Sequence, residues 1–562
     1  MHFVKKIPTT AEQKALMERE RSVKLKNFCQ LRDKIFAKRA QSDFDEEMLN
    51  LCEAVLAKNP DIYTLWNIRR ETLEKMKERN AAGDAHLERL YQNELSLTEQ
   101  CIMANPKSYS AWFQRSWILN RQAIPDLKKE LVLCKEGLKM DCRNFHCWDH
   151  RRIVAKMAKL TDEEELEFSG RLIAENFSNF SAWHMRMNLI PRFEDSETGE
   201  RLMTAEDAKE EIKRVAKAIF TDPEDQSAWM YARYIIDLYS PASFLNEESR
   251  CPIVPLSASI HSNHIVVVFT RATSEENASS FFRGIPPSAN WKAVSQFPSV
   301  SSRVWECVFE GEGKIQISKD GDTFESLNVF ARKDLYERIL CGGSVEVIER
   351  IREYCEELMK EEENNSLGLL TATECLRLTS PLQSNEVIME NLERLATSLD
   401  PLRANMYKSF ASRERIRKHL LGEEEDGGRR VLDRILEGEE RLSLHYLQLT
   451  ELPDLDLFAP FITELDVRGN GLEDMSKVSL LPLLTHLWFD ENPIRNIPSN
   501  LSAIQFLSCA STSLSDPCAV GASLRQCPSL ERFLYCQTAL VDKTDELRSI
   551  VGDGIRLFPH YL

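Results

Sequence analysis

A tryptophan-centred frame recurs five times in the N-terminal part of this 562-residue chain. The copies read "NPDIYTLWNIRR", "NPKSYSAWFQRS", "DCRNFHCWDHRR", "NFSNFSAWHMRM" and "DPEDQSAWMYAR". Their tryptophans are Trp66, Trp112, Trp148, Trp183 and Trp229, spaced by 35 to 46 residues. Repeats of this length are typical of stacked structural units, each of which buries its apolar face on the next. This feature therefore constrains the fold more than any other.

The frame predicts two helices per repeat. Apolar residues at helical spacing precede it, as at Leu131, Cys134 and Leu138. An Asn-Pro or Asp-Pro pair then ends the first helix in several copies, because the residue before proline is pushed out of the helical region. In the second helix, an aromatic residue, the tryptophan and an arginine follow at steps of three. We expect each tryptophan to lie in the core between hairpins. We expect the arginines to bind carbonyls or carboxylates at the seam, with pairs such as Arg69–Arg70 forming salt bridges.

Two further regions follow the repeats. Runs such as "HIVVVFTRA" and "SRVWECVFEGEG" predict a small β-sandwich, whose immunoglobulin-like label rests on strand count alone. Helices resume afterwards, and "DPLRANMYKSF" indicates a sixth helical copy with Tyr407 in the tryptophan position. The C-terminal part has a leucine-rich frame with asparagines at Asn470 and Asn492. Its copies start at Leu442, Leu465, Leu487, Leu507 and Phe533, which predicts about five coils.

Composition excludes several classes of function. The chain has 72 basic and 89 acidic side chains, a net charge of −17, which disfavours nucleic acid as a partner. Its 15 cysteines are odd in number and form no metal-ligand spacing, as expected of reduced cysteines in a cytoplasmic protein. The N-terminus has no apolar signal core, and the apolar runs are too short to span a membrane. We therefore expect a cytoplasmic protein with no membrane span.

The frame "NPxxYxxWxxR" resembles the alpha-subunit repeats of protein prenyltransferases. With an inserted sandwich and leucine-rich repeats, the chain resembles more closely the alpha subunits of Rab geranylgeranyl transferases. The implied fold is multidomain: a solenoid of α-α helical hairpins with an inserted β-sandwich and a C-terminal leucine-rich repeat domain. The expected bounds are 1–243 and 339–421 for the helical repeats, 244–338 for the immunoglobulin-like sandwich, 422–440 for an acidic linker or helix, and 441–562 for the leucine-rich repeats.

The resemblance implies an enzyme subunit. The activity would be transfer of geranylgeranyl from geranylgeranyl diphosphate to C-terminal cysteines of Rab GTPases, presented by a Rab escort protein. A partner beta subunit would supply the zinc and most of the isoprenoid pocket. Two alternatives stay open. The chain could be a non-catalytic scaffold of helical and leucine-rich repeats, or the alpha subunit of a farnesyl or type I geranylgeranyl transferase.

The resemblance also assigns site residues. Lys107 matches a lysine that contacts the diphosphate, and Tyr109 matches the aromatic residue two positions later. Asn144 and His146 match polar residues that line the same rim and are expected to contact substrate. His2, on the N-terminal tail, is a candidate to reach the zinc of the beta subunit.

Each of these residues also has a purely structural interpretation. A lysine in an Asn-Pro-Lys turn is usually a solvated surface charge. The other four copies have Asp61, Arg143, Ser178 and Glu224 at that place, so the architecture does not require a lysine. Tyr109 would pack against the next hairpin, His146 would be a surface or seam histidine, and His2 would be a tail residue.

Overall fold

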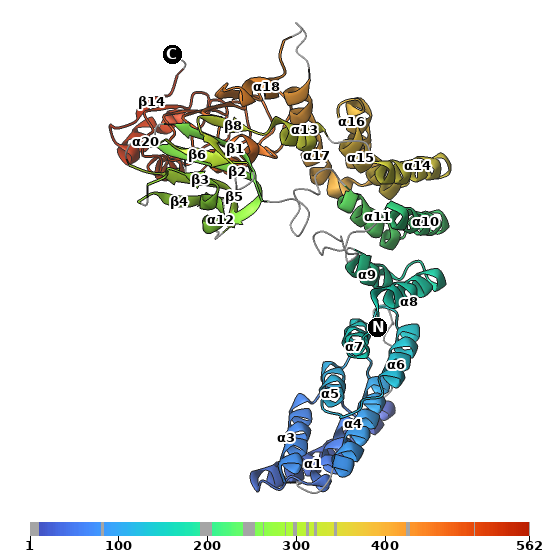
Figure 1. Cartoon of the computed structure of the whole chain (residues 1–562). Coiled ribbons are helices and arrows are strands. Elements are labelled where there is room, and N and C mark those ends of the chain that lie inside the picture. The colour runs from blue at the N-terminus through green and yellow to red at the C-terminus, as the bar shows by residue number, and fades with distance from the viewer. Residues whose placement is uncertain are drawn as a thin grey trace. The chain divides into compact units, whose positions relative to one another are not determined.

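The computed structural model describes residues 11–79, 84–190, 205–239, 253–261, 263–286, 288–295, 301–310, 314–319, 323–341, 345–422, 428–498 and 501–560 (Figure 1). His2 lies outside these residues. The chain divides into two compact units, Met1–Ile190 and Pro191–Leu562, called unit 1 and unit 2 below. Among the described residues, no helix combines the length and the apolar character needed to cross a bilayer.

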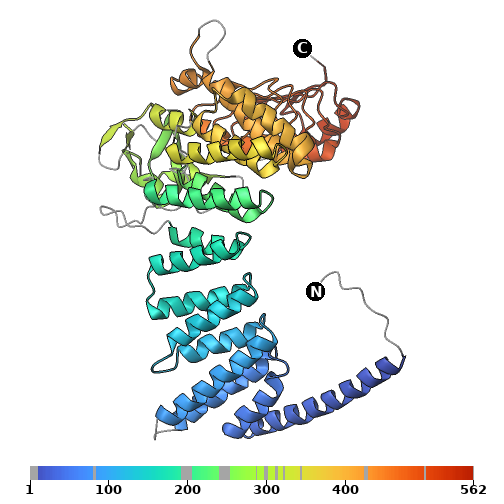
Figure 2. The same cartoon turned by 90° about the vertical axis from the view of Figure 1, so that its right-hand side faces the viewer.

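Unit 1 is a stack of helical hairpins (Figure 2). Its helices are α1 (Ala11–Ala40), α2 (Glu46–Leu56), α3 (Tyr63–Arg79), α4 (Asp84–Ala104), α5 (Tyr109–Leu119), α6 (Leu127–Met140), α7 (Phe145–Ala158), α8 (Asp162–Glu175) and α9 (Phe180–Leu189). Each even-numbered helix packs on the helix that follows it, and α5 packs on both α3 and α7. The predicted helical repeat is therefore confirmed.

Each repeat tryptophan is buried and also closes the turn of its own hairpin. Its indole N–H donates to the backbone carbonyl six residues earlier. The pairs are Trp66–Pro60 at 2.8 Å, Trp112–Pro106 at 2.8 Å, Trp148–Cys142 at 2.9 Å, Trp183–Phe177 at 2.8 Å and Trp229–Pro223 at 2.9 Å. Truncating one buried aromatic side chain to alanine costs about 3–5 kcal/mol. One such residue per hairpin therefore fixes both packing and turn geometry.

The frame arginines bind across the seam between hairpins, as expected. Arg115 makes a bidentate pair with Glu130 of the next hairpin at 2.7 Å and donates to the Leu95 carbonyl of its own hairpin at 2.9 Å. Arg69 makes the same two contacts, with Glu94 and Leu49, and Arg151 pairs with Glu165 of the next hairpin, whereas Arg186 donates to the Leu166 carbonyl of its own hairpin. A buried guanidinium needs such partners, because an unpaired buried charge is strongly destabilising.

Unit 2 begins with α10 (Ala205–Thr221) and α11 (Gln226–Tyr239) and resumes the helical hairpins after the inserted strands. The later helices are α13 (Lys333–Cys341), α14 (Glu346–Glu361), α15 (Ser366–Thr379), α16 (Asn385–Arg394), η3 (Leu395–Leu399), η4 (Pro401–Arg403), α17 (Ala404–Leu421) and α18 (Val431–Leu436). Helices α10 and α11 pack on α14, and α11 also packs on α15. Within unit 2 the chain therefore leaves its helical hairpins for the insertion and then resumes them.

The hairpin α14–α15 continues the repeat although it has no tryptophan. Asn365 caps α15 and donates to the Pro223 carbonyl at 3.0 Å, so it is bonded to the turn of the preceding hairpin. The tryptophan frame did not reveal this hairpin. Tyr407, the expected marker of a sixth copy, is buried in α17 of the following hairpin, where its hydroxyl donates to Asp400 at 2.6 Å.

The insertion forms two antiparallel sheets. Its elements are β1 (Pro255–His261), β2 (His264–Ser274), α12 (Glu275–Ser280), β3 (Phe282–Arg283), β4 (Asn290–Val294), β5 (Ser301–Val308), β6 (Gln316–Ser318), β7 (Phe324–Ser326) and β8 (Val329–Ala331). The strand orders are β4-β5-β2-β1-β8 and β3-β6-β7. Val267 and Trp305 of the larger sheet share one apolar core with Phe282 and Ile317 of the smaller sheet.

The C-terminal part is a parallel sheet of consecutive strands. Its elements are β9 (Arg441–Ser443), η5 (Leu455–Phe458), β10 (Glu464–Asp466), η6 (Ser476–Leu480), β11 (His486–Trp488), β12 (Phe506–Ser508), α19 (Pro517–Leu524), β13 (Arg532–Leu534), η7 (Val541–Lys543), α20 (Thr544–Val551) and β14 (Arg556–Phe558). The starting residue of every expected copy is the buried centre of a strand. Strand β14 adds a sixth strand beyond the five expected coils.

The two asparagines of the leucine frame bond backbone groups as expected. The side-chain oxygen of Asn470 accepts from the N–H groups of Leu447 at 3.0 Å and Leu449 at 2.9 Å. Its amide donates to the carbonyls of Leu444 at 2.9 Å and Val467 at 2.8 Å. Asn492 makes corresponding bonds one strand later. Each asparagine thus satisfies buried backbone groups that no strand pairs.

Candidate functional site

Lys107 lies in the turn between α4 and α5, and its side chain is exposed. Its backbone N–H donates to the side-chain oxygen of Asn105 at 3.2 Å. The same local bond recurs at the corresponding turn of every other copy, in the pairs Asp61–Asn59, Arg143–Asp141, Ser178–Asn176 and Glu224–Asp222. The backbone of this position is therefore built the same way in each repeat. The ammonium is what distinguishes the second copy from the other four.

Two donors hold the peptide that precedes Lys107. The Pro106 carbonyl accepts from Trp112 Nε1 at 2.8 Å and from Asn144 Nδ2 at 2.9 Å. Trp112 belongs to the same hairpin, whereas Asn144 belongs to the next one. The backbone next to Lys107 is thus fixed from both sides. Similar double bonding occurs at the Pro60 carbonyl, from Trp66 and Ser108, and at the Pro223 carbonyl, from Trp229 and Asn365.

Both the amide nitrogen and the amide oxygen of the Asn144 side chain form hydrogen bonds with other residues of the chain. While Nδ2 binds the Pro106 carbonyl, Oδ1 accepts from the N–H groups of His146 at 3.1 Å and Cys147 at 3.4 Å and so caps α7. The side chain is buried. Its visible role is to position the Lys107 turn, which sequence reasoning missed. The predicted polar contact with substrate stays a prediction.

Tyr109, Phe145 and His146 form an aromatic group beside this turn. The Tyr109 and His146 rings meet edge to face with centroids 4.2 Å apart, and Tyr109 lies 5.9 Å from Phe145. Tyr109 therefore contacts the next hairpin and still leaves 70% of its surface exposed, whereas His146 is only 6% exposed. The structural interpretation of Tyr109 holds for its contacts, but most of its ring is free to meet another molecule.

The electrostatics of His146 connect it to Lys107. Burial lowers the pKa of His146, the Asp149 carboxylate opposes this shift, and the nearby Lys107 ammonium adds to the lowering. His146 is therefore neutral at neutral pH. Because the His146 imidazole is neutral, the Lys107 ammonium carries the positive charge of this group. The structure thus brings Lys107, Tyr109, Asn144 and His146 together around one turn.

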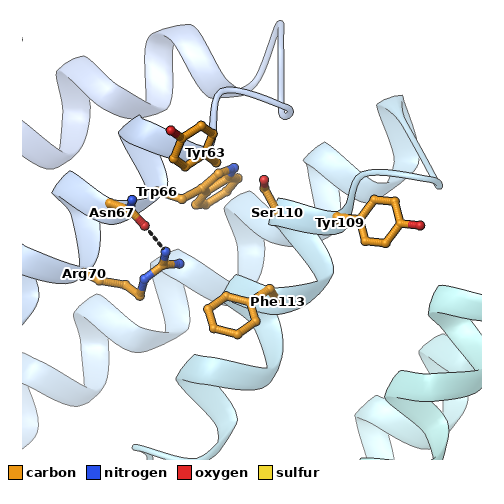
Figure 3. Close-up of a pocket in the computed structure, with 7 residues that line it drawn as sticks. All are labelled: Tyr63, Trp66, Asn67, Arg70, Tyr109, Ser110 and Phe113. Atoms are coloured by element: carbon orange, nitrogen blue, oxygen red, sulfur yellow. Dashed lines mark hydrogen bonds between the residues drawn. The ribbon is translucent and has the colours of Figure 1, made fainter.

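A shallow groove of about 300 Å³ borders this group (Figure 3). Its lining is Tyr63, Trp66, Asn67, Arg70, Tyr109, Ser110 and Phe113, from α3 and α5. Arg70 binds the amide oxygens of Gln114, at 2.8 Å, and of Asn67. Its guanidinium lies 5.0 Å from the Phe113 ring centroid. The expected salt bridge of Arg70 is thus wrong, because neutral amides hold this cation at the groove while Arg69 takes the carboxylate at the seam.

Within the described residues, no three or more histidine, cysteine or acidic side chains gather in a way that could hold a metal ion. The cysteines among them are free thiols, most of them buried, as expected. Burial raises the pKa of Cys52 and of Cys101 to about 11, so both are protonated, unreactive core residues at neutral pH.

A family model described as "Protein prenyltransferase alpha subunit repeat" matches residues 45–76, 91–122, 127–158, 162–193 and 208–239. The chain is 31% identical to a protein of Sus scrofa named "Geranylgeranyl transferase type-2 subunit alpha", over 94% of each chain. It is 32% identical to the protein of the same name from Bos taurus, again over 94% of each. The protein of that name from Dictyostelium discoideum is 36% identical over 42% of this chain and 75% of its own.

Proposed function

This chain belongs to the family of geranylgeranyl transferase type-2 alpha subunits, and from that premise we propose that it is one half of a heterodimeric protein geranylgeranyl transferase. The heterodimer transfers geranylgeranyl from geranylgeranyl diphosphate to C-terminal cysteines of Rab GTPases, which an escort protein presents. The observation that carries the proposal is the match to relatives of this name over nearly the full length of both chains.

The exposed aromatic surface of unit 1 supports a partner subunit. Tyr63, Tyr109 and Phe113 are large side chains on neighbouring helices, and each is well exposed. Clustered exposed apolar groups of this kind mark protein interfaces in soluble proteins. In the proposal the beta subunit covers this surface. It also holds most of the isoprenoid pocket and the zinc ion that makes the acceptor thiol a thiolate.

The contribution of this chain to the chemistry is assigned to Lys107. Negative charge develops on the diphosphate as it leaves, and a fixed ammonium stabilises that charge. The Coulomb attraction of one close pair is about 4 kcal/mol at an effective dielectric constant near 20, and its net contribution is smaller because both charges lose water. The bonds that fix the Pro106 carbonyl hold the backbone that carries the lysine, so only its side chain has to be ordered during the reaction. Tyr109 and His146 complete the rim of the site.

We propose a fold type for each of the two appended regions. The paired antiparallel sheets with one shared core support an inserted β-sandwich of immunoglobulin-like type. The parallel strands, their buried central leucines and the backbone bonds of Asn470 and Asn492 support a leucine-rich repeat domain. The residues assigned to the proposed active site all lie in unit 1.

Co-expression with a beta subunit tests the function. We expect the chain alone to be inactive and the heterodimer, with one zinc, to prenylate Rab–escort complexes and to ignore free CaaX peptides. Equal activity on free peptides without escort protein would favour a farnesyl or type I enzyme. Absence of any zinc-bearing partner and of any transfer would leave the scaffold alternative.

A further inference from the structure

One face of the C-terminal parallel sheet carries arginine and aromatic side chains. The central residue of each strand points into the core, so its two neighbours point to the opposite face. The residues before the centres are, in strand order, Arg441, Glu464, His486, Phe506, Arg532 and Arg556. This face takes no part in the proposed transfer reaction.

Three rings occupy the middle of this face. Trp488 and Phe506 have centroids 5.5 Å apart, and His486 lies 5.8 Å from each of them. An arginine flanks the rings on either side, with Arg441 at 5.2 Å over Trp488 and Arg532 at 5.1 Å over Phe506. All three rings remain partly exposed. Partly exposed aromatic rings that pack on one another make a contact surface that needs little ordering on binding.

The charges of this face are unbalanced at one end. Arg532 and Arg556 are direct register partners on adjacent parallel strands. Like charges in such positions destabilise a sheet. In the part of the chain that the structure describes, no carboxylate forms a salt bridge with either arginine. At the other end, Asp466 binds Arg468 at 2.7 Å and lies 3.5 Å from Arg441. The surplus positive charge therefore lies on β13 and β14.

We propose that this arginine–aromatic face, made of Arg441, His486, Trp488, Phe506, Arg532 and Arg556, binds an extended acidic peptide of a partner protein. An apolar side chain of the peptide packs on the three rings, and carboxylates downstream pair with Arg532 and Arg556. Neighbouring strands lie about 4.8 Å apart, so β12 and β14 are separated by about 10 Å. An extended peptide covers that distance in about three residues. Because the side chains of an extended peptide alternate between its two faces, the recognised pattern is an apolar residue followed by acidic residues two and four positions later.

Charge complementarity favours a peptide over other anions. The chain as a whole has a net charge of −17, which repels an extended polyanion such as a nucleic acid or an anionic membrane. A short segment senses mainly the local field, because charges beyond about 10 Å are screened at physiological salt. The rings also supply apolar contact area that free phosphate or a headgroup would not use.

The test uses the full chain in complex with its beta subunit. Fluorescein-labelled short peptides, each with one phenylalanine followed by glutamates two and four positions later, are titrated and followed by anisotropy. Matched peptides replace the glutamates by glutamine or the phenylalanine by serine. The double variant Arg532→Ala/Arg556→Ala is compared with Arg495→Ala/Arg525→Ala, which removes the same charge at exposed positions outside the strands.

We expect the acidic aromatic peptide to bind and both altered peptides to bind at least about tenfold more weakly. The Arg532→Ala/Arg556→Ala variant should weaken binding by a similar factor, while the control double variant and prenyl transfer stay unchanged. Trp488→Ala should remove the preference for phenylalanine over serine. Equal binding by both double variants, no binding of any peptide, or selective binding of anionic vesicles or phosphopeptides through this face would overturn the proposal.

Discussion

Replacing Asn144 by alanine should loosen the turn that carries Lys107. The variant loses the Nδ2 bond to the Pro106 carbonyl, at 2.9 Å, and the Oδ1 cap on His146 and Cys147. Loss of a helix cap costs about 1 kcal/mol. Loss of a buried neutral hydrogen bond costs about another 1 kcal/mol. The sum, about 2 kcal/mol, corresponds to about 30-fold faster amide exchange in the first turn of α7 if that turn opens locally.

Hydrogen exchange and steady-state kinetics of the heterodimer measure the two consequences separately. Exchange should rise at the amides of His146 and Cys147 and in the segment around Lys107. We expect kcat/KM for geranylgeranyl diphosphate to fall by about five- to tenfold, because a mobile ammonium stabilises the leaving group less well. Asn179→Ala is the matched control, since Asn179 caps α9 by accepting from Ala182 at 3.2 Å, one hairpin further on. It should loosen α9 and leave transfer unchanged.

Two results would refute this reasoning. Unchanged exchange at His146 and Cys147 would show that the Asn144 bonds contribute little to local stability. Faster exchange with unchanged kinetics would show that fixing the Pro106 carbonyl does not position Lys107 for the reaction.

Further predictions concern the seam and the parallel sheet. Burial would raise the pKa of Glu130, but hydrogen bonds from His150 and Arg115 lower it to about 2, below an ordinary value of 4.5. These bonds to the ionised Glu130 therefore contribute roughly 3 kcal/mol to the free energy of unfolding above about pH 4.5, and this contribution is lost as the pH falls towards 2. Melting temperatures against pH should fall more steeply for the native chain than for Glu130→Gln, and parallel curves would contradict the assignment. Asn470→Ala removes the side-chain bonds to the Leu447 and Leu449 N–H groups and to the Leu444 carbonyl, whereas the Val467 carbonyl keeps its bond from Asn492, and the loss should cost about 3 kcal/mol. Thermal unfolding should register this loss, with exposed Asn496→Ala as a neutral control, and an unchanged midpoint for both variants would argue against the role of Asn470.

The helical repeat was predictable because its determinants are side chains at fixed spacing. Trp112 and Arg115 mark a hairpin in the sequence and occupy the core and the seam in the structure. Helical repeats were expected over 339–421, but the tryptophan frame did not mark the hairpin α14–α15, because its turn keeps only the asparagine, Asn365, of that frame. Strand β14 was missed for a similar reason, since its pairing uses backbone groups that any residue offers.

The site was predictable only in part. The resemblance selected Lys107, but it could not indicate that Asn144 fixes the adjacent peptide from another hairpin. That bond joins residues far apart in sequence, and its acceptor is a backbone carbonyl, which every residue type has. The identity of residue 106 therefore gives no sign of it. The exposure of Tyr109 was also unpredictable, because an aromatic residue three positions before the tryptophan fits the repeat whether its ring is buried or exposed.

The most direct test of the account is the Lys107→Ala heterodimer, assayed for single-turnover transfer and for geranylgeranyl diphosphate affinity. Arg143→Ala is the matched control, because Arg143 occupies the same turn position one hairpin later. A charge-assisted contact is worth about 1.5–3 kcal/mol. We therefore expect kcat/KM to fall by about 10- to 100-fold for Lys107→Ala, with assembly and zinc content intact and the control unaffected. Full turnover and unchanged diphosphate affinity in Lys107→Ala would contradict the central claim that this lysine holds the departing diphosphate.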